Sequence, residues 1–148
     1  MSSLNRIGNI IIRTSADKKI IIVRLIVGII FLTEGLQKYL FPDLLGTGRF
    51  LKIGFPDPEF WAYFTGTFEI VCGTLVILGF VTRLASIPLL TVMAVAFVTT
   101  KWPLLINKGF WVMMHEYRTD FAMTLLLIFL FISGGGKWSV DSAVNRRR

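Results

Sequence analysis

FWAYFTGTFEIVCGTLVILGF, residues 60–80, is a continuous apolar stretch with one charged side chain, Glu69, almost at its centre. A helix over these residues rises about 1.5 Å per residue and reaches roughly 31 Å, which matches the hydrocarbon thickness of a bilayer. The stretch therefore predicts a membrane-spanning helix with Glu69 near the midplane.

Glu69 is expected to face protein, water or a ligand, because a lone carboxylate in lipid costs on the order of 3 kcal/mol. Gly66, Glu69 and Gly73 are spaced i, i+3, i+7 and so share one helix face. Two glycines on that face let another helix approach closely beside the acid. Glu69 is then either a buried polar anchor in a packed bundle or part of a functional site.

The composition of the whole chain indicates an integral membrane protein. It has 148 residues, of which 54 % are hydrophobic, and its mean hydropathy is +0.68. The net charge of +7 would suggest nucleic acid as the partner of a soluble protein, but here the basic residues flank apolar runs. That placement indicates membrane topology, with the lipid bilayer as a partner and no nucleic acid. Cys72 is the single cysteine and is expected to be a free, buried thiol.

Four spans are predicted, at residues 20–41, 60–80, 84–100 and 115–133, within one transmembrane domain at 20–136. A basic arm at 1–19 precedes the domain, and a basic tail at 137–148, expected to be mobile, follows it. Ten lysines and arginines belong to one side, namely Arg6, Arg13, Lys18, Lys19, Arg24, Arg83, Lys137, Arg146, Arg147 and Arg148, against four on the other, Arg49, Lys52, Lys101 and Lys108. This bias predicts an all-α, antiparallel four-helix bundle in the cell membrane, multi-pass, with both termini cytoplasmic.

Local signals refine the ends of the spans. Arg24 is expected to snorkel to the cytoplasmic interface, and Pro42 to end the first helix. The connector at 43–59 mixes apolar and basic residues, which suits a segment lying in the membrane surface or forming a lid. Lys101-Trp102-Pro103 predicts the end of the third helix.

Charged residues enter the first and fourth spans. Glu34 and Lys38 have the i, i+4 spacing of an ion pair on one helix face, which is either a device that makes insertion tolerable or part of a site. The fourth apolar run is short, so its helix has to carry charged residues into the outer half of the membrane. The topology brings these groups together with Glu69. The candidate site residues are Glu34, Lys38, Glu69, His115, Glu116, Arg118 and Asp120.

Such a cluster is a default candidate for a binding site or a proton path. Lys38 and Arg118 are expected to donate hydrogen bonds to carbonyl or anionic oxygens, while Glu69 or Asp120 exchanges protons with a reduced quinone. A small oxyanion is the other ligand considered. We expect Glu69, Glu34, Lys38 and Arg118 to form one buried network.

Several motifs in the sequence resemble one family of membrane proteins. Those in the central stretch and directly after it are Gly66-Thr67-Phe68-Glu69-Ile70, Gly73 and Gly79-Phe80-Val81-Thr82-Arg83. The others are Arg24, Gly28, Phe31, Gly35, Lys38, Met93, Ala96 and Gly134-Gly135-Gly136-Lys137-Trp138-Ser139-Val140-Asp141. In order and spacing the set resembles the DoxX family of small four-helix bacterial and archaeal membrane proteins, over about residues 20–141.

The resemblance implies a small subunit of a quinol oxidase or thiosulfate:quinone oxidoreductase system, or a membrane partner of sulfur or oxidative-stress enzymes. It also implies a carboxylate near the place of Asp120. Two other functions stay open: a membrane anchor or assembly protein without a site, and a transporter of a small solute or proton.

The sequence also limits the redox chemistry. One histidine, His115, does not supply bis-histidine haem ligation, one cysteine does not hold an iron–sulfur cluster, and neither a Rossmann fingerprint nor a P-loop occurs. We expect no metal site and no haem, cluster or flavin, with a quinone as the cofactor to consider. Any enzyme activity then belongs to a non-autonomous subunit with a membrane or soluble redox protein as partner. A homo-oligomer is also compatible with the sequence.

Overall fold

The computed structural model describes residues 12–146. Within this range the helices are α2 Ile20–Leu40, α3 Thr47–Ile53, α4 Pro58–Leu78, α5 Thr82–Ala96, the π-helix η1 Phe97–Lys101, α6 Trp102–Lys108, α7 Phe110–Ser133 and α8 Val140–Arg146. The described part of the chain contains no strand. The all-α prediction is confirmed, while most of the predicted arm, residues 1–11, lies outside the described residues.

Three helical segments are long and apolar enough to cross a membrane: α2, α4 and the continuous run Thr82–Lys108. The fourth long helix, α7, has 24 residues. Its first half carries Glu116, Arg118 and Asp120, while its second half is apolar. Three segments are therefore apolar enough to span a membrane over their length, and the fourth long helix is polar at its start.

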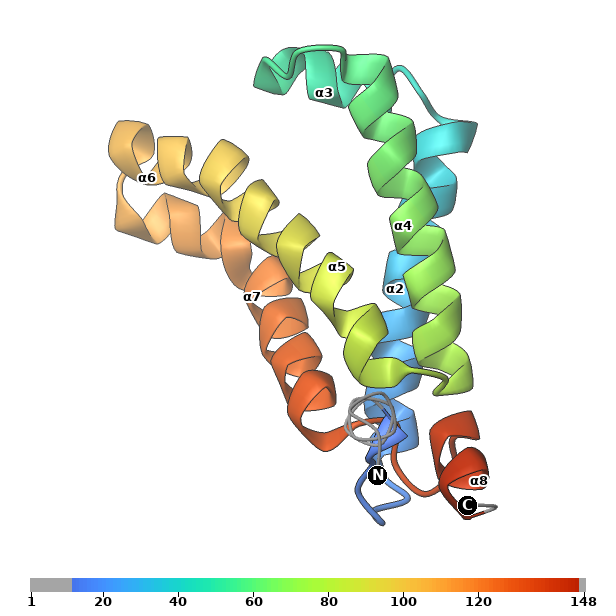
Figure 1. Cartoon of the computed structure of the whole chain (residues 1–148). Helices are drawn as coiled ribbons and strands as arrows, with labels where there is room; N and C mark the ends of the chain where they lie inside the picture. The colour runs from blue at the N-terminus through green and yellow to red at the C-terminus, as the bar shows by residue number, and fades with distance from the viewer. Residues whose placement is uncertain (1–11, 147–148) are drawn as a thin grey trace, which may run out of the picture.

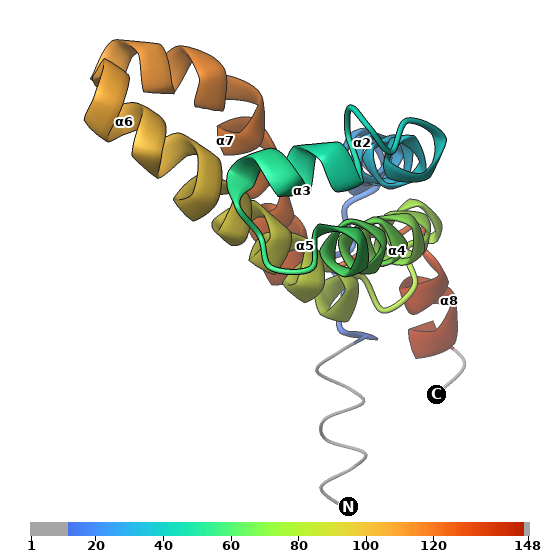
Figure 2. The ribbon, with the colours of Figure 1, turned by 90° about the horizontal axis from the view of Figure 1, so that it is seen from above.

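The long helices form two pairs that meet at one end and separate at the other. Figure 1 shows α2 beside α4 and α5 beside α7, with successive long helices running in opposite directions. The pairs converge near α8, at what we call the closed end (Figures 1 and 2). They diverge towards α3 and α6, at what we call the open end, and α3 lies across this wider end.

Glycines bring α2 and α4 into close contact. A Cβ atom added to Gly35 would lie 2.7 Å from the carbonyl oxygen of Gly66, and one added to Gly73 would lie 2.9 Å from the backbone nitrogen of Leu32. Side chains at these positions would therefore push the two backbones apart. This confirms that the face bearing Gly66 and Gly73 packs against another helix.

The buried apolar core lies where the two pairs converge. It includes Val27, Val76, Leu89 and Leu127, all completely covered, from the four long helices in turn. Cys72 packs in the same cluster as a free thiol, as predicted. These core residues pack the two helix pairs together over only part of their length. The pairs are not packed against each other at the open end.

The prediction that Lys101-Trp102-Pro103 ends the third helix is wrong. The helix changes to π-helical geometry at Phe97–Lys101 and then continues as α6. Pro103 lies in the first turn of α6, where a missing backbone N–H is tolerated. The wider π-helical turn thus carries the chain past a residue that normally stops a helix.

Arg24 is buried at the closed end, so the prediction that it snorkels is wrong. Its guanidinium donates to the carbonyl oxygens of Val76 and Ile77, at 3.0 and 2.6 Å, in the last turn of α4. It also donates to the carbonyl oxygens of Gly135 and Trp138, at 2.8 and 2.6 Å. The five donors of the guanidinium suit the free carbonyls of a helix end.

Asp141, on α8, closes the same junction from the other side. One carboxylate oxygen accepts from the backbone N–H of Val81 at 2.7 Å, and the other accepts from the N–H and hydroxyl of Thr82, both at 3.0 Å. Asp141 is 1 % exposed and so provides, from a distant part of the sequence, the cap of α5. The expectation of a mobile tail is therefore wrong for residues 137–146.

Candidate functional site

A cavity of about 410 Å³ lies between the two helix pairs towards the open end. Aromatic side chains form much of its lining, namely Phe31, Phe50, Phe55, Trp61 and Phe64. Its charged lining residues are Glu34, Lys38, Arg49, Glu69 and Asp120. Ligand sites commonly have this size and this combination of apolar walls with a few polar groups.

A buried ion pair lies on the α2–α4 wall of the cavity. Lys38 Nζ is 2.5 Å from Glu69 Oε2, and the two side chains are 10 % and 5 % exposed. Gly35 and Gly66 lie one helical turn before these residues on their helices, and their close contact holds the two side chains within reach. In this pair the two charges neutralise each other, whereas each alone would be costly in lipid.

The i, i+4 spacing suggested that Lys38 pairs with Glu34. In the structure its partner is Glu69 instead. Lys38 Nζ reaches only the backbone carbonyl oxygen of Glu34, at 3.4 Å. The Glu34 side chain lines the cavity but remains exposed. The short separation of α2 and α4 explains the difference, because it offers Lys38 a carboxylate on the facing helix.

On the opposite wall, Asp120 lines the cavity and forms a second ion pair. Lys101 Nζ, from η1, is 3.3 Å from Asp120 Oδ2 on α7 and 3.1 Å from the carbonyl oxygen of Glu116. Thr99 and Thr100 of η1 line the cavity, whereas Lys101 is not part of its lining. Sequence reasoning missed these three residues of η1 because it placed the end of the helix there.

The short helix α3 covers the cavity at the open end. Arg49, Phe50 and Ile53 of α3 all line it. The ring of Phe50 contacts that of Phe55 edge-on at 5.2 Å between centroids, and Phe55 contacts Trp61 at 6.0 Å. An aromatic cluster thus ties α3 to the start of α4, in agreement with the expectation of a lid.

Three predicted site residues lie outside the cavity. His115, Glu116 and Arg118 are exposed on the first half of α7, and Arg118 Nη1 is 3.4 Å from His115 Nδ1. The prediction that Arg118 joins the buried network is wrong. Because the helix pairs diverge, this half of α7 is not covered by α2 and α4, and Asp120 alone among these charged residues faces the cavity.

Of the seven predicted residues, the cavity lining therefore brings together Glu34, Lys38, Glu69 and Asp120. It adds Arg49, while Lys101 contributes only as the ion-pair partner of Asp120. No group of three or more histidine, cysteine or acidic side chains suited to a metal occurs within residues 12–146. Chemically, the arrangement offers cations that donate hydrogen bonds and carboxylates that accept them, beside aromatic walls.

The three apolar helices of membrane-spanning length define a multi-pass membrane protein. Comparison with protein families identifies the family: the DoxX profile matches residues 20–102, and the chain belongs to the DoxX family. No solved structure matches it.

Two relatives are similar over most of their length. "Uncharacterized membrane protein Rv3486" of Mycobacterium tuberculosis is 47 % identical over 143 residues, which cover 93 % of this chain and 88 % of the relative. "Putative oxidoreductase CatD" of Bacillus subtilis is 32 % identical over 127 residues, which cover 84 % of this chain and 85 % of the relative.

Proposed function

We propose that this protein is the membrane subunit of a quinone-linked oxidoreductase and that its cavity binds the quinone head group. The buried Lys38–Glu69 ion pair on the wall of an aromatic-lined cavity is the observation that carries the proposal. An ion pair that served only to stabilise two packed helices would not need to face open space. The name of one relative, "Putative oxidoreductase CatD", supports the same class of activity.

The lining residues fit a quinone in shape and chemistry. Aromatic side chains such as Phe31 and Phe64 offer flat apolar surfaces to the ring. Lys38 donates a hydrogen bond to a carbonyl oxygen of the oxidised form. Glu69 or Asp120 accepts a proton from a hydroxyl of the reduced form.

Oxidation of a quinol releases two protons and two electrons, and the electrons need an acceptor. With one histidine and one cysteine in the sequence, we place that acceptor on a partner redox protein. The proposed enzyme is therefore a complex, in which this chain binds the lipid-soluble substrate and exchanges its protons.

The proposed topology has four crossings, with both termini in the cytoplasm and α3 outside. It rests on the ten-to-four bias of basic residues and on the antiparallel packing of α7 against α5. In this arrangement the charged first half of α7 lies at the outer boundary of the membrane, and the cavity opens towards the outer half.

Binding of a short-chain quinone, followed by quenching of tryptophan fluorescence, tests the proposal on the purified protein. Lys38→Met should weaken binding at least about tenfold, because a hydrogen bond to a charged group contributes about 1.5–3 kcal/mol. Lys108→Met, at an exposed lysine outside the cavity, is the matched control and should bind as the native protein does.

Equal affinity in both variants would contradict the proposal. Unaltered activity of the native membrane complex with Lys38→Met would favour an anchor. Flux of a small solute into liposomes that contain this chain alone would favour a transporter.

A further inference from the structure

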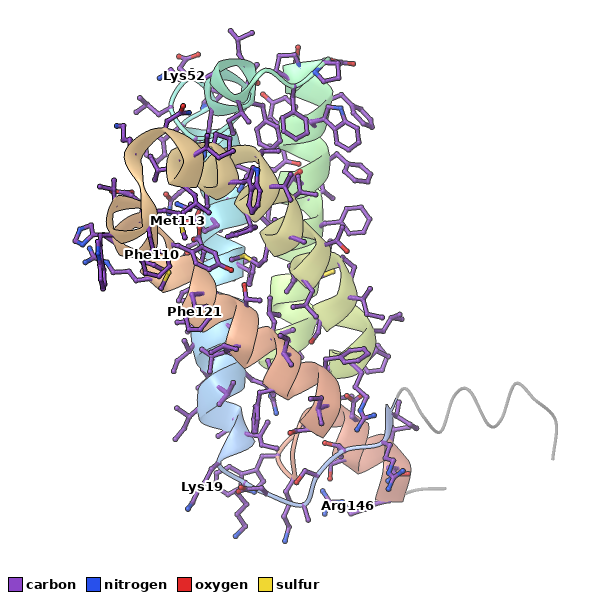
Figure 3. All side chains as sticks on the ribbon, turned by 90° about the vertical axis from the view of Figure 1, so that its left-hand side faces the viewer. Lys19, Lys52, Phe110, Met113, Phe121 and Arg146 are labelled. Atoms are coloured by element: carbon purple, nitrogen blue, oxygen red, sulfur yellow. The ribbon has the colours of Figure 1, made fainter. Side chains whose placement is uncertain are left out.

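A second, smaller depression, about 220 Å³ in volume, lies at the closed end, away from the cavity. It is formed by the segment before α2, the loop before α8 and α8 itself. Its polar lining residues are Thr14, Ser15, Lys137, Ser142, Asn145 and Arg146. Figure 3 shows Arg146 at this end together with Lys19, and Lys52 at the other.

The lining of this depression is cationic. Two basic side chains, three hydroxyls and one amide contribute to it, and no carboxylate does. The acidic groups close by in the sequence are engaged elsewhere: Asp141 caps α5, and Asp17 accepts from the backbone N–H of Lys19 at 2.8 Å. Neither ion pair found among residues 12–146 involves Lys137 or Arg146.

Neighbouring side chains indicate that the depression lies at the level of the lipid headgroups. Trp138, next to Lys137, is 59 % exposed, and Lys18 Nζ lies 5.7 Å from the centre of its ring. Exposed tryptophan beside lysine at the end of a membrane helix is typical of the interface between water and hydrocarbon. The exposed apolar side chains of α2 begin at Ile22.

We propose that this depression binds the phosphate of an anionic phospholipid headgroup. Lys137 and Arg146 neutralise the phosphate charge, and the hydroxyl and amide groups donate hydrogen bonds to its oxygens. The acyl chains then lie along the apolar surface of the bundle. Basic pockets at the ends of membrane helices bind anionic headgroups in this way.

Thermal unfolding of the purified full-length protein in detergent, with phosphatidylglycerol, phosphatidylcholine or inorganic phosphate added, tests this assignment. Phosphatidylglycerol should raise the Tm of the native protein, because a ligand that binds the folded state stabilises it. The double variant Lys137→Gln/Arg146→Gln should lose at least half of that rise. The matched control Arg13→Gln/Lys19→Gln removes the same charge at the same end, outside the depression, and should keep most of it.

Native mass spectrometry of the same variants provides a second measurement, because it counts bound lipids independently of stability. The native protein and the control should retain phosphatidylglycerol that the double variant has lost. Equal Tm shifts in the two double variants would overturn the proposal in favour of a diffuse charge effect. If inorganic phosphate raised the Tm of the native protein as much as phosphatidylglycerol does, the proposal would be overturned in favour of a small-anion site. An equal rise with phosphatidylcholine would also overturn it, because the depression would then have no preference for an anionic headgroup.

Discussion

Lys38 Nζ and Glu69 Oε2 lie 2.5 Å apart across the interface of α2 and α4, and the two residues are 8 % and 4 % exposed. Closely packed glycines one turn earlier on each helix hold the pair in place. The pair also faces the cavity. It is therefore both part of the helix interface and the most buried polar feature of the candidate site.

Replacing one member of this pair should reduce stability more than replacing both members, because the remaining charge stays buried without a partner. Lys38→Met leaves a buried carboxylate without its partner, a change that typically costs about 3–5 kcal/mol unless the acid takes up a proton. Lys38→Met/Glu69→Gln should cost less than the sum of the two single changes. Thermal unfolding in detergent gives the comparison.

The Lys101–Asp120 pair is the internal control for that cycle. Its Asp120 side chain is 32 % exposed, so its coupling should be weaker, about 1 kcal/mol or less. Additive losses at Lys38 and Glu69 would show that the two residues are not coupled.

The close packing of α2 and α4 should not tolerate even one methyl group. Gly35→Ala places a Cβ 2.7 Å from the carbonyl oxygen of Gly66, and overpacking of this kind costs about 1–3 kcal/mol. Thr74→Ala, at an exposed position of α4, should change stability by less than about 0.5 kcal/mol. Equal Tm values for the two variants would refute the close contact.

Asp141 should be essential for the closed end. Asp141→Asn keeps one acceptor oxygen but loses the charge and one set of hydrogen bonds to the start of α5, and loss of a helix cap costs about 1–2 kcal/mol. Asp17→Asn makes the same chemical change at an exposed position and should cost less. Unfolding curves in which both variants lose equal stability would contradict the capping role.

The features of the fold that could be predicted from the sequence are local ones. The apolar stretch at 60–80 corresponds to α4 at Pro58–Leu78, and the glycines on one face of that stretch face α2. These features follow from hydrophobic length and helical periodicity, which are local properties. Membership of the DoxX family, inferred from short motifs, is also confirmed.

Features that depend on contacts between helices were not predictable in the same way. Arg24 is close to a helix end in the sequence, yet the carbonyl groups of α4 and of the loop before α8 surround it. Lys38 has a carboxylate at i−4, yet a nearer one stands on the facing helix. A proline normally stops a helix, but here a π-helical turn precedes Pro103 and the helix continues as α6.

Thiol labelling in intact cells tests the proposed topology. In a Cys72→Ala background, Lys52→Cys and Asn107→Cys, both at exposed positions of the open end, should react with a membrane-impermeant maleimide. Ala143→Cys on α8 should react only after the membrane is permeabilised. Labelling of Ala143→Cys in intact cells would reverse the orientation.

Photolabelling with an azidoquinone tests most directly whether the cavity binds a quinone. Peptide mapping of the labelled protein should place the label on residues 30–38 and 61–69, which line the cavity from α2 and α4, and an excess of unmodified quinone should prevent the labelling. Label spread over lipid-facing surfaces, or label that excess quinone does not displace, would contradict quinone binding in the cavity.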